Sequence, residues 1–162
     1  MTTEKQTYWK QELAQARTEL ENFLHSLTPA ELQTPVVSED QTTWTVLDVV
    51  AHLLENERGM SIHIHKIRKG QETVPADFDL NHWNAGLKGR ISNLSLPELL
   101  QNLAQVRART LKELESLSPE EWSLQGRHPA RGMITVEQYY ETMAYHDRHH
   151  LNDIKQALGR RS

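Results

Sequence analysis

Histidine is the residue type in this chain best suited to chemistry, with nine among 162 residues and no cysteine. Imidazole titrates near neutral pH and binds divalent metals, so this abundance indicates acid–base or metal chemistry. The most informative spacing is that of His146 and His150. Side chains at i and i+4 share one face of a helix, so one helix can offer two imidazoles to a single ion. Such a pair can also arise by surface coincidence or ring stacking.

Helical-wheel positions distinguish the other histidines. His52 lies at the edge of an apolar stripe, where a histidine is either a hydrogen-bonded boundary residue or a ligand. His63 lies on nearly the same side, about 16 Å further along the axis, so it is predicted to line a pocket rim and not to share a metal with His52. His149 is rotated by about 100° from His150 and is predicted to be solvated. The remaining histidines are interpreted as surface or loop residues: His25, His65, His82 and His128.

Two acidic residues, Glu57 and Asp147, fall near the centres of apolar stripes, where burial is expected. A buried carboxylate must be paired or must change its protonation state. In a structural interpretation, each accepts hydrogen bonds from a facing helix. In a chemical interpretation, one of them orients a metal-binding histidine or acts as a general base on a bound water. Asp153 lies about 10 Å along the axis from His146, too far to share its metal directly.

Four long helices are predicted to position these side chains. Apolar residues at i, i+3 and i+4 spacing predict helices over residues 5–27, 44–69, 95–117 and 135–158. Short capped turns are expected at 28–31 and 118–121, and loops at 71–80 and 125–132. A further helix is predicted over 81–92, although it carries two glycines. The sequence therefore predicts one all-α domain over residues 1–162, a four-helix bundle.

Composition narrows the expected partners to small molecules. The net charge is -4 with no extended basic cluster, so nucleic acid is not expected as a partner. No apolar run approaches the ~20 residues of a membrane-spanning helix, and the first residues lack an apolar signal segment. We therefore expect a cytoplasmic protein that does not associate with a membrane. The sequence lacks His-Glu-x-x-His, Glu-x-x-His and glycine-rich phosphate-binding motifs, which argues against zincins, di-iron bundles and nucleotide-binding proteins.

Two segments resemble one known family. The stretch 44–53, WTVLDVVAHL, resembles the W-(S/T)-x-x-(D/E)-x-x-x-H-(L/I) start of the second helix in DinB-like (DinB/YfiT-type) proteins. The stretch 144–154, AYHDRHHLNDI, is similar to their last-helix motif H-x-x-x-H-x-x-x-I. The resemblance covers essentially the whole chain. It implies an up-down-down-up four-helix bundle, often a homodimer, with zinc or nickel held by histidines that correspond to His52, His146 and His150.

The resemblance implies several different kinds of activity. Characterised members include transferases and isomerases that use low-molecular-weight thiols, and others are described as metal-dependent hydrolases. Three neutral imidazoles leave a coordination position open, as in catalytic metal sites. The expected function is a metal-dependent enzyme that activates water, or a thiol supplied by a substrate, for transfer to a small electrophile. The alternatives are a non-catalytic bundle that binds a metal or sequesters a small molecule, and an interaction domain with a vestigial site.

Overall fold

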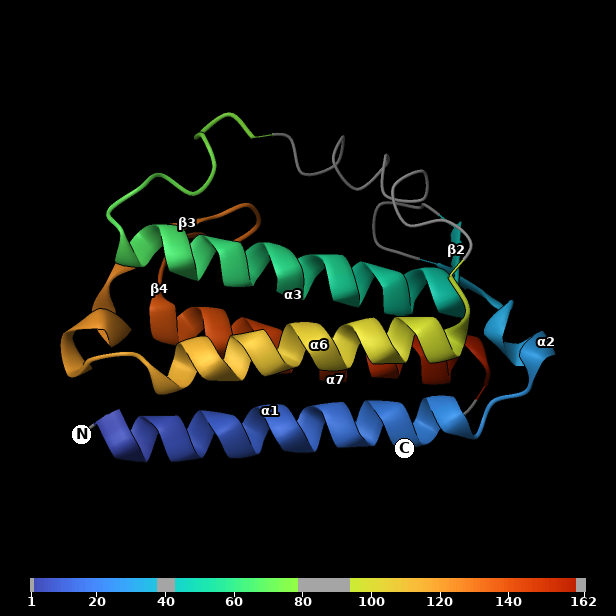
Figure 1. Cartoon of the computed structure of the whole chain (residues 1–162). Helices are drawn as coiled ribbons and strands as arrows, with labels where there is room; N and C mark the ends of the chain where they lie inside the picture. The colour runs from blue at the N-terminus through green and yellow to red at the C-terminus, as the bar shows by residue number, and fades with distance from the viewer. Residues whose placement is uncertain (1, 38–42, 79–93, 160–162) are drawn as a thin grey trace.

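Most of the computed structural model lies in four long helices (Figure 1): α1 (Thr2–His25), α3 (Val46–Arg68), α6 (Leu96–Glu115) and α7 (Val136–Ala157). The structure describes residues 2–37, 43–78 and 94–159. All four long helices agree with the predicted ranges to within three residues at each end. The helix predicted over 81–92 lies outside the described residues.

The helix starts are fixed locally by side-chain caps. At α3, Thr45 Oγ1 accepts from the Asp48 amide at 3.2 Å, and Asp48 Oδ2 accepts from the Thr45 amide at 2.9 Å. These reciprocal bonds satisfy two backbone groups that would otherwise lack helical partners. Helices α6 and α7 begin with the same kind of capping box. The short predicted turns are also present, as α2 (Pro29–Leu32) and the 3-10 helix η1 (Pro119–Ser123).

The four long helices run up, down, down and up. In Figure 1, α1 and α7 run in one direction, whereas α3 and α6 run in the other. Helix α1 packs against α7, and α3 packs against both α6 and α7. This arrangement confirms the predicted fold class and topology. It also makes α3 and α7 antiparallel neighbours, so that the start of α3 lies beside the end of α7.

Two short antiparallel ribbons interrupt the otherwise helical fold, and the sequence analysis did not predict them. Strands β1 (Pro35–Val37) and β2 (Thr43–Thr45) form the first, and β3 (Gln125–His128) and β4 (Gly132–Thr135) form the second. The prediction of a loop over residues 125–132 is therefore wrong. Strands of three or four residues are too short to show an alternating pattern. The second hairpin packs closely on α3, because a Cβ added at Gly126 would collide with the side chain of Ile67.

The apolar core divides into two clusters along the bundle. One includes Leu24, Trp44 and Leu103, toward the end where α3 begins. The other includes Ile64 and Tyr140, toward the end where α7 begins. A layer of buried charged side chains lies between them and is described below. Within the described residues, no helix combines the length and apolar character needed to cross a membrane.

Candidate functional site

Three histidines from two helices meet near the start of α3. The ring centroids of His52 and His150 lie 5.1 Å apart, and those of His146 and His150 lie 5.7 Å apart. His52 comes from α3, and the other two come from α7. The antiparallel packing of these helices therefore brings together the residues that the sequence analysis selected as ligands. Their role as metal ligands stays a prediction.

Each imidazole of this group has a distinct environment. His52 Nε2 lies 2.8 Å from Asn56 Nδ2, and His150 Nδ1 lies 3.2 Å from Asp153 Oδ2. His146 Nδ1 is buried and has no hydrogen-bond partner among the described residues. Burial, together with a smaller effect of the neighbouring His150, lowers the pKa of His146 to about 3. The His146 imidazole is therefore neutral, with a lone pair available for a ligand.

These donors suit a divalent metal. Neutral imidazole nitrogens are common zinc ligands, and a buried nitrogen without a partner is costly unless something binds it. The contact between His150 and Asp153 is the carboxylate–histidine pair that usually orients a metal-bound ring. In the described part of the chain, however, no three His, Asp or Glu side chains already converge in metal-binding geometry. The residues fit a metal, and binding would require the rings to rotate toward a common point.

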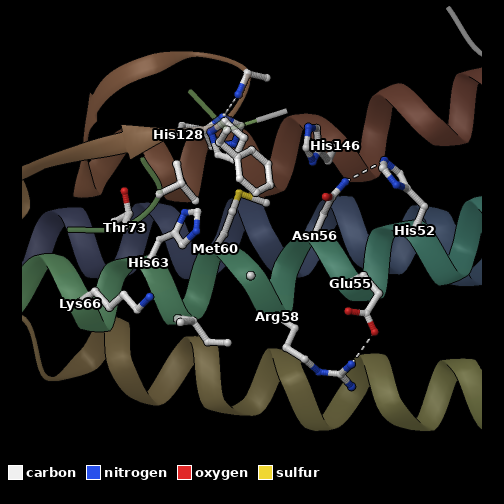
Figure 2. Close-up of a pocket in the computed structure, with 16 residues that line it drawn as sticks. His52, Glu55, Asn56, Arg58, Met60, His63, Lys66, Thr73, His128 and His146 are labelled. Atoms are coloured by element: carbon white, nitrogen blue, oxygen red, sulfur yellow. Dashed lines mark hydrogen bonds and ion pairs between the residues drawn. The ribbon is translucent and has the colours of Figure 1, made fainter. Parts of the chain in front are cut away.

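A cavity of about 440 Å³ lies beside the histidine group (Figure 2). His52 and His146 line one end of it, and His63 and His128 line the other. Met60 lies between the two ends, and its sulfur is visible in Figure 2. Apolar walls with a few polar side chains are typical of small-molecule pockets.

The far end of the cavity contains a histidine that the sequence analysis misplaced. His128 was interpreted as a surface or loop residue, but it is 7% exposed and lies in β3. Its Nδ1 accepts from the backbone amides of Ala130 and Arg131 at 3.0 and 3.1 Å. A helical wheel could not predict the burial of this residue, because the residue lies in a short hairpin and not in a helix. His63 lines the cavity as predicted, and its Nδ1 lies 3.2 Å from the Tyr139 hydroxyl.

His149 is only partly solvated. It stacks on Tyr145 with ring centroids 5.2 Å apart, and its Nε2 lies 3.6 Å from Asp153 Oδ2. Its side chain is 36% exposed, against 17% for His150, so the predicted contrast between the two neighbours holds in direction. His25 and His65 are exposed, as expected. His82 lies outside the described residues.

The two acidic candidates lie in a buried charged layer to which each long helix contributes one residue: Arg17, Glu57, Arg107 and Asp147. Glu57 accepts from Arg17 Nη2 at 2.8 Å and from Arg107 Nε at 2.9 Å. Asp147 accepts from Arg17 Nε at 3.2 Å and from Arg107 Nη2 at 3.1 Å. Neither carboxylate lines the cavity. These contacts favour the structural interpretation of Glu57 and Asp147 over a catalytic one.

The layer also fixes the ionisation of Glu57. Burial by itself raises the pKa of this carboxyl, but the charges and hydrogen bonds of Arg107 and Arg17 outweigh burial. The hydroxyl of Thr110 adds a further hydrogen bond at 2.8 Å. The pKa of Glu57 is therefore lowered, and that of Arg107 is raised by its two carboxylate partners in spite of burial. Two cations thus neutralise two carboxylates inside the bundle.

Asp153 is the acidic residue whose contact the sequence analysis missed. The axial distance of about 10 Å from His146 predicts only that Asp153 does not share a metal directly with that histidine. The hydrogen bond of Asp153 is with His150, three residues earlier on the same helix face, and His149 Nε2 lies 3.6 Å from the same carboxylate. The i, i+3 spacing is the signal that could have revealed this contact.

Known proteins resemble this chain in sequence and in fold. The sequence pattern of the DinB superfamily matches residues 12–154. A protein of Oceanobacillus iheyensis named "Putative metal-dependent hydrolase OB0782" is 26% identical over 146 residues, which is 90% of this chain and 81% of that protein.

Two solved structures share the architecture. TT2238, described as a four-helix bundle protein, has a TM-score of 0.66 and 25% identity, covering 95% of this chain and 98% of its own. YfiT from Bacillus subtilis, described as "a probable metal-dependent hydrolase with an unusual four-helix bundle topology", has a TM-score of 0.75 and 21% identity. That match covers 99% of this chain and 91% of YfiT. At this identity, the likeness to YfiT establishes the fold.

Proposed function

This chain belongs to the DinB superfamily, whose pattern spans residues 12–154 of it, and on that premise we propose that it is a metal-dependent hydrolase. The proposed site holds one divalent ion on His52, His146 and His150. The observation that carries the proposal is the meeting of these three imidazoles beside a cavity, one end of which is lined by His52 and His146. The names given to the Oceanobacillus iheyensis relative and to YfiT support the same chemistry.

The residues around the site have separable roles in this proposal. His146 stays neutral at neutral pH because burial lowers its pKa, so one of its ring nitrogens keeps a lone pair. Asp153 holds the His150 ring through Nδ1, which leaves Nε2 as the nitrogen that would bind the ion. Asn56 Nδ2 lies 2.8 Å from His52 Nε2, and because an amide N–H can only donate, binding of the ion through Nε2 would require this contact to open or the Asn56 amide to turn over. A divalent metal held by imidazoles supplies a nucleophile at neutral pH, because it lowers the pKa of water toward ~7.

The finer features of the proposal follow from the family resemblance. The metal is zinc or nickel, the substrate is a small electrophilic molecule, and the protein is a cytoplasmic homodimer. A low-molecular-weight thiol in place of water is the alternative nucleophile. The chain contains no cysteine, so such a thiol must be supplied from outside the protein.

Metal binding is tested by replacing two adjacent histidines, of which only His150 is a proposed ligand. Full-length protein purified without an affinity tag should take up about one zinc or nickel ion per chain at slightly alkaline pH. His150→Ala removes a proposed ligand and should abolish stoichiometric binding. His149→Ala is the matched control and should retain it. Elemental analysis and calorimetric titration measure both. Metal content that survives in His150→Ala and is lost in His149→Ala would contradict the assignment of the ligands.

Activity is tested with the metal-loaded protein on a panel of small esters, amides and electrophiles. Hydrolysis that stops on addition of a chelator supports the proposed function. Consumption of an added low-molecular-weight thiol, with no hydrolysis, would replace the hydrolase with a thiol transferase. Stoichiometric metal uptake with neither activity would favour the non-catalytic metal-binding bundle.

A further inference from the structure

The cavity has a second polar end, away from the proposed metal ligands. His63 lies about 16 Å along α3 from His52, and His128 approaches it from the β3–β4 hairpin. Both rings pack against Tyr139, with centroid distances of 5.8 Å for His63 and 5.6 Å for His128. Figure 2 shows these two histidines together on the far side of Met60 from His52. The function proposed above does not use them.

The hydrogen bonds of His128 determine where its proton lies. Its Nδ1 is within 3.0 Å of the Ala130 amide and 3.1 Å of the Arg131 amide. Backbone N–H groups can only donate, so Nδ1 must be the acceptor and carries no proton. The neutral ring therefore carries its proton on Nε2. His128 offers a fixed N–H donor.

The hydrogen bonds of His63 determine the opposite tautomer. The Tyr139 hydroxyl lies 3.1 Å from the carbonyl oxygen of Arg127, and a carbonyl can only accept. That carbonyl also accepts from Thr73 Oγ1 at 2.6 Å, and its second lone pair can take the phenolic proton; in this arrangement the proton points to Arg127. The Tyr139 oxygen, 3.2 Å from His63 Nδ1, must then accept a proton from that nitrogen. His63 Nε2 is left with a lone pair and offers a fixed acceptor.

Both rings stay uncharged at neutral pH. Burial lowers the pKa of His63 to about 4, with a further contribution from Lys66. Burial also lowers the pKa of His128 to about 4, with contributions from His63 and Arg131. The two imidazoles thus present one neutral donor and one neutral acceptor. Apolar side chains, including Met60, Val74 and Phe78, line the same cavity.

From this geometry we infer that the His63–His128 end of the cavity is a binding subsite for a neutral carboxamide group. The amide oxygen accepts from His128 Nε2–H, and the amide N–H donates to His63 Nε2. A carboxylate fits less well, because it has no proton for the lone pair of His63. An apolar group attached to the amide lies against the walls between the two ends. This inference goes beyond the proposed function and requires no metal.

The protonation pattern is tested first, by NMR of the imidazole nitrogens in the full-length protein at neutral pH. We expect a proton on Nδ1 of His63 and on Nε2 of His128. In Tyr139→Phe, the acceptor for the His63 proton is removed, so the Nδ1–H tautomer of His63 should lose its preference. A wild-type His63 protonated on Nε2, or a wild-type His128 protonated on Nδ1, would overturn the inference.

The ligand preference is tested with N-methylhydrocinnamamide and its ketone isostere, in which a methylene replaces the N–H. Binding is measured by protein NMR in the presence of a chelator, so that the metal-dependent hydrolysis proposed above cannot consume the amide. The amide should bind about fivefold more tightly, since it makes one additional hydrogen bond. It should also bind more tightly than hydrocinnamate, which tests whether Lys66 attracts an anion to this end instead.

Variants then test whether His63 and Tyr139 cause the preference for the amide over the ketone. His63→Ala and Tyr139→Phe should both reduce the amide-to-ketone ratio to about one. His65→Ala changes an exposed histidine two residues away on the same helix and should leave the ratio unchanged. The inference is refuted if the wild-type protein binds the amide no better than the ketone, prefers hydrocinnamate, or binds no amide at all. A preference that persists in both His63→Ala and Tyr139→Phe would also refute it. Failure of metal uptake or of hydrolysis would leave these outcomes unaffected, so the two proposals can fail separately.

Discussion

Replacing Arg107 with methionine tests the buried charged layer that joins the four helices. Arg107 donates to Glu57 through Nε and Nη2, both at 2.9 Å, to Asp147 at 3.1 Å and to the carbonyl oxygen of Leu13 at 2.8 Å. Methionine keeps an unbranched apolar side chain, which ends at about the position of Arg107 Nε, and it has no donor. Arg17 would then be the single guanidinium facing two buried carboxylates.

The expected loss of stability is large. Removing one partner of a buried ion pair typically costs about 3–5 kcal/mol, because the remaining charge is left uncompensated. We expect Arg107→Met to fall in that range. The matched control is Arg58→Met: its ion pair with Glu55, at 2.7 Å, lies at the surface with the Arg58 side chain 39% exposed. Exposed pairs contribute about 0–1 kcal/mol, so the control should lose no more than that. Urea unfolding followed by the helical circular dichroism signal measures both.

The pH dependence gives a second, independent measurement. In the wild-type protein the pKa of Glu57 is lowered, so this group contributes stability above its unfolded pKa of about 4.3 and loses that contribution as the pH falls. In Arg107→Met the effect of burial, which raises the pKa of Glu57, is opposed by Arg17 alone. The variant should therefore lose less stability on acidification than the wild type does.

A charge-matched double variant sharpens the test. Adding Glu57→Gln to Arg107→Met removes the unmatched buried charge and should recover part of the lost stability. Equal stability losses for Arg107→Met and Arg58→Met, or no recovery in the double variant, would show that these four side chains do not act as a buried ionic network.

Three further outcomes are expected. Asp153→Asn should weaken metal binding by roughly 10–100-fold, measured calorimetrically, whereas Glu141→Gln at an exposed site of the same helix should not. In metal-free protein, the three histidines whose pKa values are lowered by burial, His63, His128 and His146, stay neutral while the unfolded chain takes up protons. The free energy of unfolding should therefore fall as the pH drops from about 6.5 to about 4, and a flat urea-denaturation series over this range would contradict this. Gly126→Ala should cost about 1–3 kcal/mol in the same assay, because the added Cβ collides with Ile67, whereas Gly59→Ala meets no neighbouring atom and should not destabilise.

The sequence by itself determined the features that depend on neighbours along the chain. Apolar residues at helical spacing located the four long helices, and capping pairs such as Thr45 and Asp48 fixed their starts. The same periodicity predicted that Glu57 and Asp147 would be buried. The four-residue spacing of His146 and His150 placed both rings on one helix face, because a helix repeats every 3.6 residues. These are local properties, so a short stretch of the sequence is enough to predict them.

Only the tertiary structure decided which distant side chains meet. The ring of His52 reaches His150 because α3 and α7 pack antiparallel at a particular axial offset, which no local pattern specifies. Glu57 could have paired with any donor on a facing helix, and packing selected Arg17 and Arg107. His128 lies beside the cavity because a short hairpin folds back over α3. Pairing across a bundle and the placement of a four-residue strand depend on the summed packing of the whole chain, and not on the residues next to them in sequence.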